Sequence, residues 1–238
     1  MALALIVALM LGASEPAALS PQTEALIAPV RESIEQVRAR HAALPPPTSD
    51  AERLVRMGEL DRAGRVVIVA MDFSKIPEAE RSAALDKAAG WIEAVDQENQ
   101  KALLAMVPPE GWFLRSRYGK GAGAAFHIVQ HADETLWRRF LPVLEPLVAQ
   151  GEIDGQNYGL MYDRLATSEG RLQRYGSQFR CDNGKWRPYP IEDPSKLDER
   201  RAAMGFIESF DTYKTRMQSG PACPQTRSPP PPGMNITD

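Results

Sequence analysis

Two histidines one helical turn apart are the residues whose spacing most directly suggests chemistry. His127 and His131 fall in the apolar run 122–131, and on a helix they lie about 40° apart on one face. This is the geometry of an i, i+4 pair of metal ligands, which needs a further ligand such as Asp133 or Asp163. Since the chain has no HExxH glutamate and no CxxC pair, we expect no metal and no cofactor. The alternative is a histidine hydrogen-bonded inside a helical core.

His131 is also the candidate for acid–base catalysis. Imidazole titrates near neutral pH, and a carboxylate bound to one ring nitrogen leaves the other able to take a proton. Asp133 or Asp163 could be that carboxylate, so we take His131, Asp133 and Asp163 as candidate catalytic residues. The alternatives are structural. Asp133 stands just before an apolar stripe, where a helix N-cap is expected, and Asp163 is either solvated or paired with an arginine.

Candidate ligand-binding residues gather in and near the segment QRYGSQ at 173–178. Gly176 can adopt a backbone conformation that other residues avoid, which would aim its neighbours from a tight bend. The candidates are Arg164, Gln173, Tyr175, Gln178 and Arg201. They could present donors to a sugar, a peptide or an anion. Alternatively, because buried amides and phenols need partners, they join a hairpin to the helices.

The charge is distributed unevenly. The whole chain has a net charge of −3, whereas residues 171–201 contain eight Lys or Arg against five Asp or Glu, a balance of +3. An anionic group would be drawn to this stretch, where Arg200 and Arg201 could fork onto a phosphate or a carboxylate. A solvated basic face is the alternative. The acidic chain as a whole argues against a nucleic-acid partner.

Five short boxes stand between residues 111 and 205. They are Gly111-Trp112 with Ser116 and Gly119, Gln130-His131-Ala132-Asp133, Asp163-Arg164, Gln173 to Gln178, and Arg200-Arg201 with Met204-Gly205. In this order and spacing they resemble a bacterial family catalogued only as a domain of unknown function. The resemblance covers roughly residues 93–213 and implies no established activity. The recurring polar residues that it implies are His131, Asp133, Asp163, Arg164, Gln173, Tyr175, Gln178 and Arg201.

Hydrophobic periodicity predicts a mainly α fold with one β-hairpin near residues 176–188. Asn183-Gly184 between two short strand-like runs is a strong hairpin signal. We expect a kink or a break near Leu141, because Pro142 and Pro146 fall inside an amphipathic stripe. The apolar run 66–71 fits either a helix or a strand. The predicted helices cover 30–41, 50–60, 78–106, 122–131, 136–148, 158–166, 196–204 and 207–217.

Both ends of the chain indicate export. An apolar run at 2–11 followed by small residues predicts a signal peptide over 1–14, although no Lys or Arg precedes Arg31. The only two cysteines, Cys181 and Cys223, then suggest one disulfide worth about 4 kcal/mol, with two unrelated buried thiols as the alternative. We expect an N-terminal helix and Pro-rich linker over 20–49, a single domain over 50–217, and a Pro-rich disordered tail over 218–238.

These observations predict a periplasmic or secreted protein with no membrane span after signal cleavage. The first hypothesis is a polar pocket that binds a small polar or anionic envelope ligand, with a hydrolysis centred on His131. The alternative is a non-catalytic envelope protein whose polar boxes form a structural network and which binds a protein partner. The sequence leaves open whether the protein is an enzyme, since it contains no GxSxG, no P-loop and no dinucleotide-binding glycines.

Overall fold

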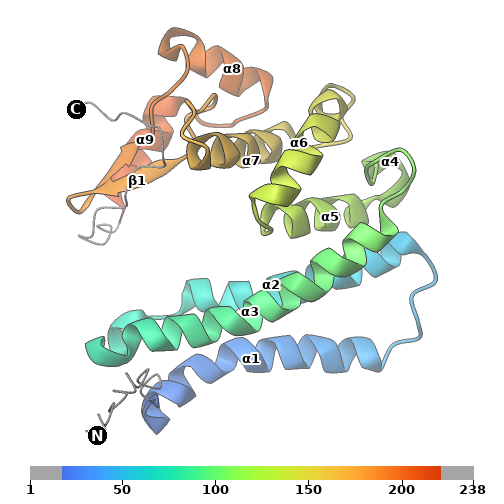
Figure 1. The fold of residues 1–238 in the computed structure, drawn as a ribbon, viewed down its shortest axis with the longest axis vertical. Coiled ribbons are helices and arrows are strands. Elements are labelled where there is room, and N and C mark those ends of the chain that lie inside the picture. Colours follow the sequence, from blue (N-terminus) through green and yellow to red (C-terminus); the bar gives the residue numbers. More distant parts are fainter. Residues whose placement is uncertain (1–17, 221–238) are drawn as a thin grey trace, which may run out of the picture. The chain divides into compact units, whose positions relative to one another are not determined.

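The structure is a computed structural model that describes residues 18–220 (Figure 1). Within them the fold is mainly α, and the only sheet is a two-stranded hairpin. This confirms the predicted fold class. The helices are α1 (Pro21–Ala42), α2 (Asp50–Ala70), α3 (Glu78–Met106), α4 (Arg115–Tyr118), α5 (Lys120–Gln130), α6 (Glu134–Ala149), α7 (Gly155–Ser168), α8 (Leu197–Ala203) and α9 (Phe210–Ser219). The strands are β1 (Phe179–Asp182) and β2 (Lys185–Pro188), and short 3-10 turns cover Phe73–Lys75 and Pro194–Lys196.

The contacts divide the chain into two compact units. Within the described residues, the first unit comprises 18–44 and 60–95, and the second comprises 45–59 and 96–220. Helices α2 and α3 therefore contribute residues to both units. In the first unit, helix α1 packs with residues 60–95. The sequence suggested instead a separate N-terminal helix, a linker and one domain over 50–217. That division of the sequence stays a prediction.

The first unit is a small helical core built around one face of α1. Its buried residues recur every three or four positions, which places them on a single stripe. They are Ile27, Val30, Ile34 and Val37. The apolar run 66–71, which fitted either a helix or a strand, is helical as far as Ala70. No helix within residues 18–220 is long and apolar enough to cross a membrane.

The second unit has the larger core, centred on aromatic side chains. Trp112 and Phe140 are both buried and meet edge to face, with ring centroids 5.1 Å apart. Helix α5 buries one face, which includes Ala125 and Ile128, while its opposite side is only partly covered. Gly58 lets the start of α2 approach α5 closely, because a Cβ at that position would lie only 2.6 Å from the Cβ of Ala124.

Helix α6 runs without a break through both of its prolines. Of the two alternatives predicted near Leu141, the break is therefore wrong, and the kink stays a prediction. Pro142 lacks one backbone hydrogen bond, but the buried stripe of the same helix includes Phe140, Leu141 and Leu144. Burying such side chains contributes about 1.5–3 kcal/mol each, which offsets the local loss.

The hairpin forms where Asn183-Gly184 predicted it. β1 and β2 pair antiparallel, with Phe179 opposite Pro188 and Asp182 opposite Lys185. Asn183 and Gly184 have φ angles of 50° and 77°. Both central residues of a type I′ turn need positive φ, and this turn matches the twist of the paired strands.

Candidate functional site

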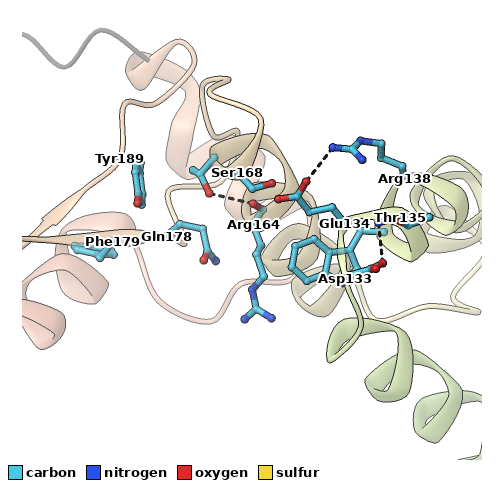
Figure 2. Close-up of a pocket in the computed structure, with 11 residues that line it drawn as sticks. Asp133, Glu134, Thr135, Arg138, Arg164, Ser168, Gln178, Phe179 and Tyr189 are labelled. Carbon is cyan, nitrogen blue, oxygen red and sulfur yellow. Dashed lines mark hydrogen bonds and ion pairs between the residues drawn. The ribbon is translucent and has the colours of Figure 1, made fainter. Parts of the chain in front are cut away.

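A cleft of about 610 Å³ lies between the start of α6, the end of α7 and the hairpin (Figure 2). This volume falls in the range of small-molecule sites. Polar and aromatic side chains share its lining, which consists of Asp133, Glu134, Thr135, Trp137, Arg138, Arg164, Thr167, Ser168, Gln178, Phe179 and Tyr189. Asp133, Arg164 and Gln178 are the three sequence candidates among them.

Asp133 caps helix α6 at the rim of the cleft. Its Oδ1 accepts hydrogen bonds from the backbone N–H groups of Thr135 at 2.9 Å and Leu136 at 3.3 Å. The side chain is exposed. The capping alternative is confirmed, and it leaves the second carboxylate oxygen without a hydrogen bond from the described residues. A catalytic role for Asp133 stays a prediction.

Arg164 presents a cation to the cleft from helix α7. Its Nη1 donates to the carbonyl of Gln130 at 3.2 Å, and the guanidinium carbon lies 5.7 Å from the centre of the Trp137 ring. None of the described carboxylates pairs with it. Burial lowers the pKa of Arg164, but an arginine remains protonated near neutral pH. The cleft therefore contains a half-buried positive charge that makes no ion pair with any described carboxylate.

The neighbouring arginine of the cleft is neutralised. Arg138 donates to Glu134 at 3.0 Å and to Glu169 at 2.6 Å, and Glu169 also accepts from Arg171. Sequence reasoning missed this network. The i, i+4 spacing of Glu134 and Arg138 was a readable signal for half of it, whereas the contact with Glu169 joins two helices.

Asp163 holds the 173–178 loop from inside the protein. It is fully buried, and its carboxylate accepts backbone hydrogen bonds from Arg174 at 2.7 Å, Tyr175 at 3.0 Å and Ser177 at 2.9 Å. Burial raises the pKa of Asp163, while these N–H groups act in the opposite direction. Asp163 is therefore neither solvated nor paired with an arginine, so both structural alternatives named above are corrected. It is an acceptor for backbone donors, and its catalytic role stays a prediction.

Gln173 joins the loop to the hairpin. Its side chain is fully buried, and Nε2 donates to the carbonyls of Gln178 at 3.1 Å and Tyr189 at 2.8 Å. Its Oε1 accepts from the backbone N–H of Gln178 at 2.8 Å. Gln178 itself lines the cleft, and its amide donates to Ser177 Oγ at 3.0 Å. Of the two glutamines, only Gln178 has its side chain at the cleft.

Tyr175 and Arg201 belong to the same buried network. The ring of Tyr175 stacks on Phe206 with centroids 5.9 Å apart. Arg201, which is 2% exposed, donates to the carbonyl of Tyr175 at 2.7 Å and to that of Glu208 at 2.9 Å. Arg200 likewise donates to backbone carbonyls, including that of Arg174. The two arginines predicted to fork onto an anion are therefore bound to the backbone, and ligand roles for Tyr175 and Arg201 stay predictions.

Gly176 gives the loop its bend. Its φ of +66° lies in the left-handed region, as the sequence suggested. A Cβ here would lie 2.8 Å from the ring of Phe210. The loop therefore closes tightly on α9, because this position lacks a side chain.

His131 ends helix α5 and does not line the cleft. It is the C-cap residue, and its backbone N–H donates to the carbonyl of His127 at 3.0 Å. Within residues 18–220, no group of three or more His, Cys, Asp or Glu side chains could hold a metal ion. The acid–base role predicted for His131 stays a prediction.

Several predictions fall on residues that the structure does not describe. Cys181 is buried in β1, but Cys223 lies outside the described residues, as do the signal peptide over 1–14 and nearly all of the tail. The disulfide therefore stays a prediction.

The structure separates the sequence candidates into two groups. Asp133, Arg164 and Gln178 meet at the cleft, while the loop network contains Asp163, Gln173, Tyr175 and Arg201. The cleft residues that the sequence did not single out as functional include Trp137, Phe179 and Tyr189. Strand alternation would place the consecutive side chains of Gln178 and Phe179 on opposite faces, so it gave no signal for their shared cleft. The position of Tyr189 depends on the pairing of the two strands.

Comparisons with known proteins identify a family and no activity. No curated protein and no solved structure matches the chain. A family model described as "Family of unknown function (DUF6624)" matches residues 48–218, which include the cleft and the loop network. The chain belongs to this family of unknown function.

Proposed function

We propose that the protein binds a small polar ligand in the cleft, through an anionic group of the ligand that pairs with Arg164. The observation that carries the proposal is the half-buried guanidinium, which has one carbonyl partner and no carboxylate partner in the described residues. A carboxylate or phosphate would supply the missing counter-charge through charge-assisted hydrogen bonds. The side chain of Gln178 lines the same cleft, but its Nε2 already donates to Ser177 Oγ and to the carbonyl of Leu160, so the guanidinium of Arg164 carries the proposal.

Aromatic side chains support a ligand with an apolar part. Trp137, Phe179 and Tyr189 line the cleft beside the polar groups. Small-molecule sites typically combine an apolar wall with a few convergent polar groups that fix orientation. The proposed ligand is therefore anionic at one end and apolar or flat elsewhere.

Binding is better supported than hydrolysis. Of the three residues predicted to be catalytic, only Asp133 lines the cleft, and the carboxylate of Asp163 is occupied by three backbone N–H groups. The alternative hypothesis receives support for its first half, because Asp163, Gln173 and Arg201 join the loop to helices and hairpin. No contact in the described residues supports a protein partner.

Titration calorimetry with a panel of small carboxylates and phosphates tests the proposal. Arg164→Gln should weaken binding of any hit by about tenfold or more, since a hydrogen-bonded charge contributes about 1.5–3 kcal/mol. Arg139→Gln is the matched control, because Arg139 is an exposed arginine of α6 that does not line the cleft. The proposal fails if no anion binds, or if both variants weaken binding equally.

We also propose that the protein is exported and that Cys181 and Cys223 form a disulfide. The apolar N-terminal run and the even cysteine count support this. Mass spectrometry of the protein purified from its host should find a mature N-terminus near residue 15 and, without reductant, one peptide pair containing both cysteines. An intact N-terminus in the cell interior would contradict export, and two separate thiols would contradict the disulfide.

A further inference from the structure

The cleft has two charges left over once its internal ion pair is counted. Four charged side chains line it: Asp133, Glu134, Arg138 and Arg164. Glu134 and Arg138 bind each other at 3.0 Å, and Glu169 adds a second carboxylate to Arg138. This leaves the Asp133 carboxylate and the Arg164 guanidinium as charges that face the cleft without an ion-pair partner among the described residues.

Asp133 has one carboxylate oxygen to offer a ligand. Both capping hydrogen bonds go to Oδ1, from the N–H groups of Thr135 and Leu136. Oδ2 accepts none from the described residues, and no described Lys or Arg pairs with the carboxylate. The cap fixes the side chain against the helix terminus, so its second oxygen is held in place without being consumed.

The two charges stand on different elements. Asp133 precedes α6, whereas Arg164 lies on α7, and Figure 2 shows both side chains at the same cleft. Arg164 is not an ion-pair partner of Asp133 within residues 18–220. Opposite charges that share a cleft but do not neutralise each other are complementary to a molecule with the reverse arrangement of charge.

Building on the proposed function, we infer that the ligand is a zwitterion of the amino-acid class, with a free ammonium group and a carboxylate. The carboxylate pairs with Arg164 and the ammonium pairs with Oδ2 of Asp133. The side group of the ligand rests on the aromatic wall that includes Trp137 and Tyr189. A cleft with these contacts distinguishes a free amine from an acylated one, since an acylated amine carries no charge for Asp133.

The test compares three forms of the same probes on the purified full-length chain. The probes are an aromatic, an aliphatic and a polar amino acid, each as the free zwitterion, the N-acetyl derivative and the carboxamide, with inorganic phosphate alongside. At least one zwitterion should bind about fivefold or more tightly than its N-acetyl derivative, which lacks the ammonium charge. The carboxamide lacks the carboxylate and should also bind more weakly.

Asp133→Asn isolates the charge, because asparagine caps a helix as well as aspartate does. In this variant the zwitterion should bind no better than the N-acetyl derivative, whose own affinity should not change. Asp154→Asn is the matched control: Asp154 is an exposed aspartate that caps α7 by accepting from Asn157 at 2.8 Å, and it does not line the cleft. It should keep the wild-type preference.

The outcomes separate this inference from the proposed function. If N-acetyl derivatives or phosphate bind through Arg164 as tightly as the zwitterions do, the inference is overturned and the anion-binding proposal stands. An Asp133→Asn variant that keeps the preference also overturns the inference. If no probe binds, or if Arg164→Gln weakens the binding of none of them, both are overturned.

Discussion

The 173–178 loop network and the adjacent cleft each contain an aspartate and an arginine, but the charged groups have partners in the loop network and no ion-pair partner among the described residues in the cleft. In the loop network, Asp163 and Arg201 are buried, and backbone groups occupy their charged atoms. At the cleft, Asp133 and Arg164 keep charged atoms that no described residue neutralises. Polar residues grouped together in the sequence therefore divide into those whose charged atoms bind the backbone and those whose charges no described residue neutralises.

The largest expected effect is the loss of the Asp163 carboxylate. Asp163→Ala leaves three buried backbone N–H groups without an acceptor, so the free energy of unfolding should fall by about 4 kcal/mol. Urea unfolding measures it, with Asp211→Ala at an exposed site of α9 as the control. A decrease below about 1 kcal/mol in the free energy of unfolding would show that Asp163 is not needed to hold the loop.

The two arginines should differ in what their loss costs. Arg201→Gln removes hydrogen bonds to two backbone carbonyls, of which that of Tyr175 is buried, and should lower the free energy of unfolding by about 3 kcal/mol. Arg164→Gln should cost about 1 kcal/mol, since it loses one carbonyl contact and the Trp137 ring contact. Thermal unfolding of the two variants checks this ranking. Equal decreases in the free energy of unfolding would show that Arg201 stabilises the fold no more than Arg164 does.

A substitution at the bend of the loop should have a slightly smaller effect. Gly176→Ala places a Cβ against the Phe210 ring and strains a left-handed residue, for a cost of about 2 kcal/mol. Gly90→Ala is the control in helix α3, where no atom lies within 4 Å of the added methyl group. That change should stabilise the protein by up to about 1 kcal/mol. If both alanines were tolerated alike, the loop would not be tightly closed.

The smallest expected effect is a pH dependence due to Asp163. Because burial raises its pKa above the ordinary aspartate value, the folded state binds more protons than the unfolded state between these two values. The contribution is fully present below the unfolded pKa and is lost as pH rises through the folded pKa. Relative to Asp163→Asn, the wild type should therefore gain stability as pH falls from about 7 to about 4. The opposite slope in urea unfolding would show that the three N–H donors outweigh burial.

Features of the fold that depend on neighbouring residues could be predicted from the sequence. Asn183-Gly184 predicted the hairpin because a type I′ turn needs residues that tolerate positive φ. Asp133 before an apolar stripe predicted a helix cap, and its Oδ1 makes that cap. By contrast, the sequence could not decide whether Pro142 breaks α6, because buried contacts elsewhere on a helix decide whether it tolerates a proline.

Less of the candidate site could be predicted, since its residues are defined by distant partners. Asp163 was read as solvated or ion-paired, yet its acceptors are used by a loop 11 to 14 positions further along the chain. Gln173 depends on Tyr189, 16 positions away. Nothing within a few residues of either side chain indicates these contacts.

The sequence by itself determined the mainly α class, the hairpin, the Asp133 cap and the set of polar residues, because periodicity, turn chemistry and capping act over a few neighbouring positions. Only the tertiary structure decided which of those polar residues are charged groups without an ion-pair partner among the described residues. A charge stays uncompensated when the packing of helices and hairpin brings it no partner, and that packing left Asp133 and Arg164 on the two sides of one cleft.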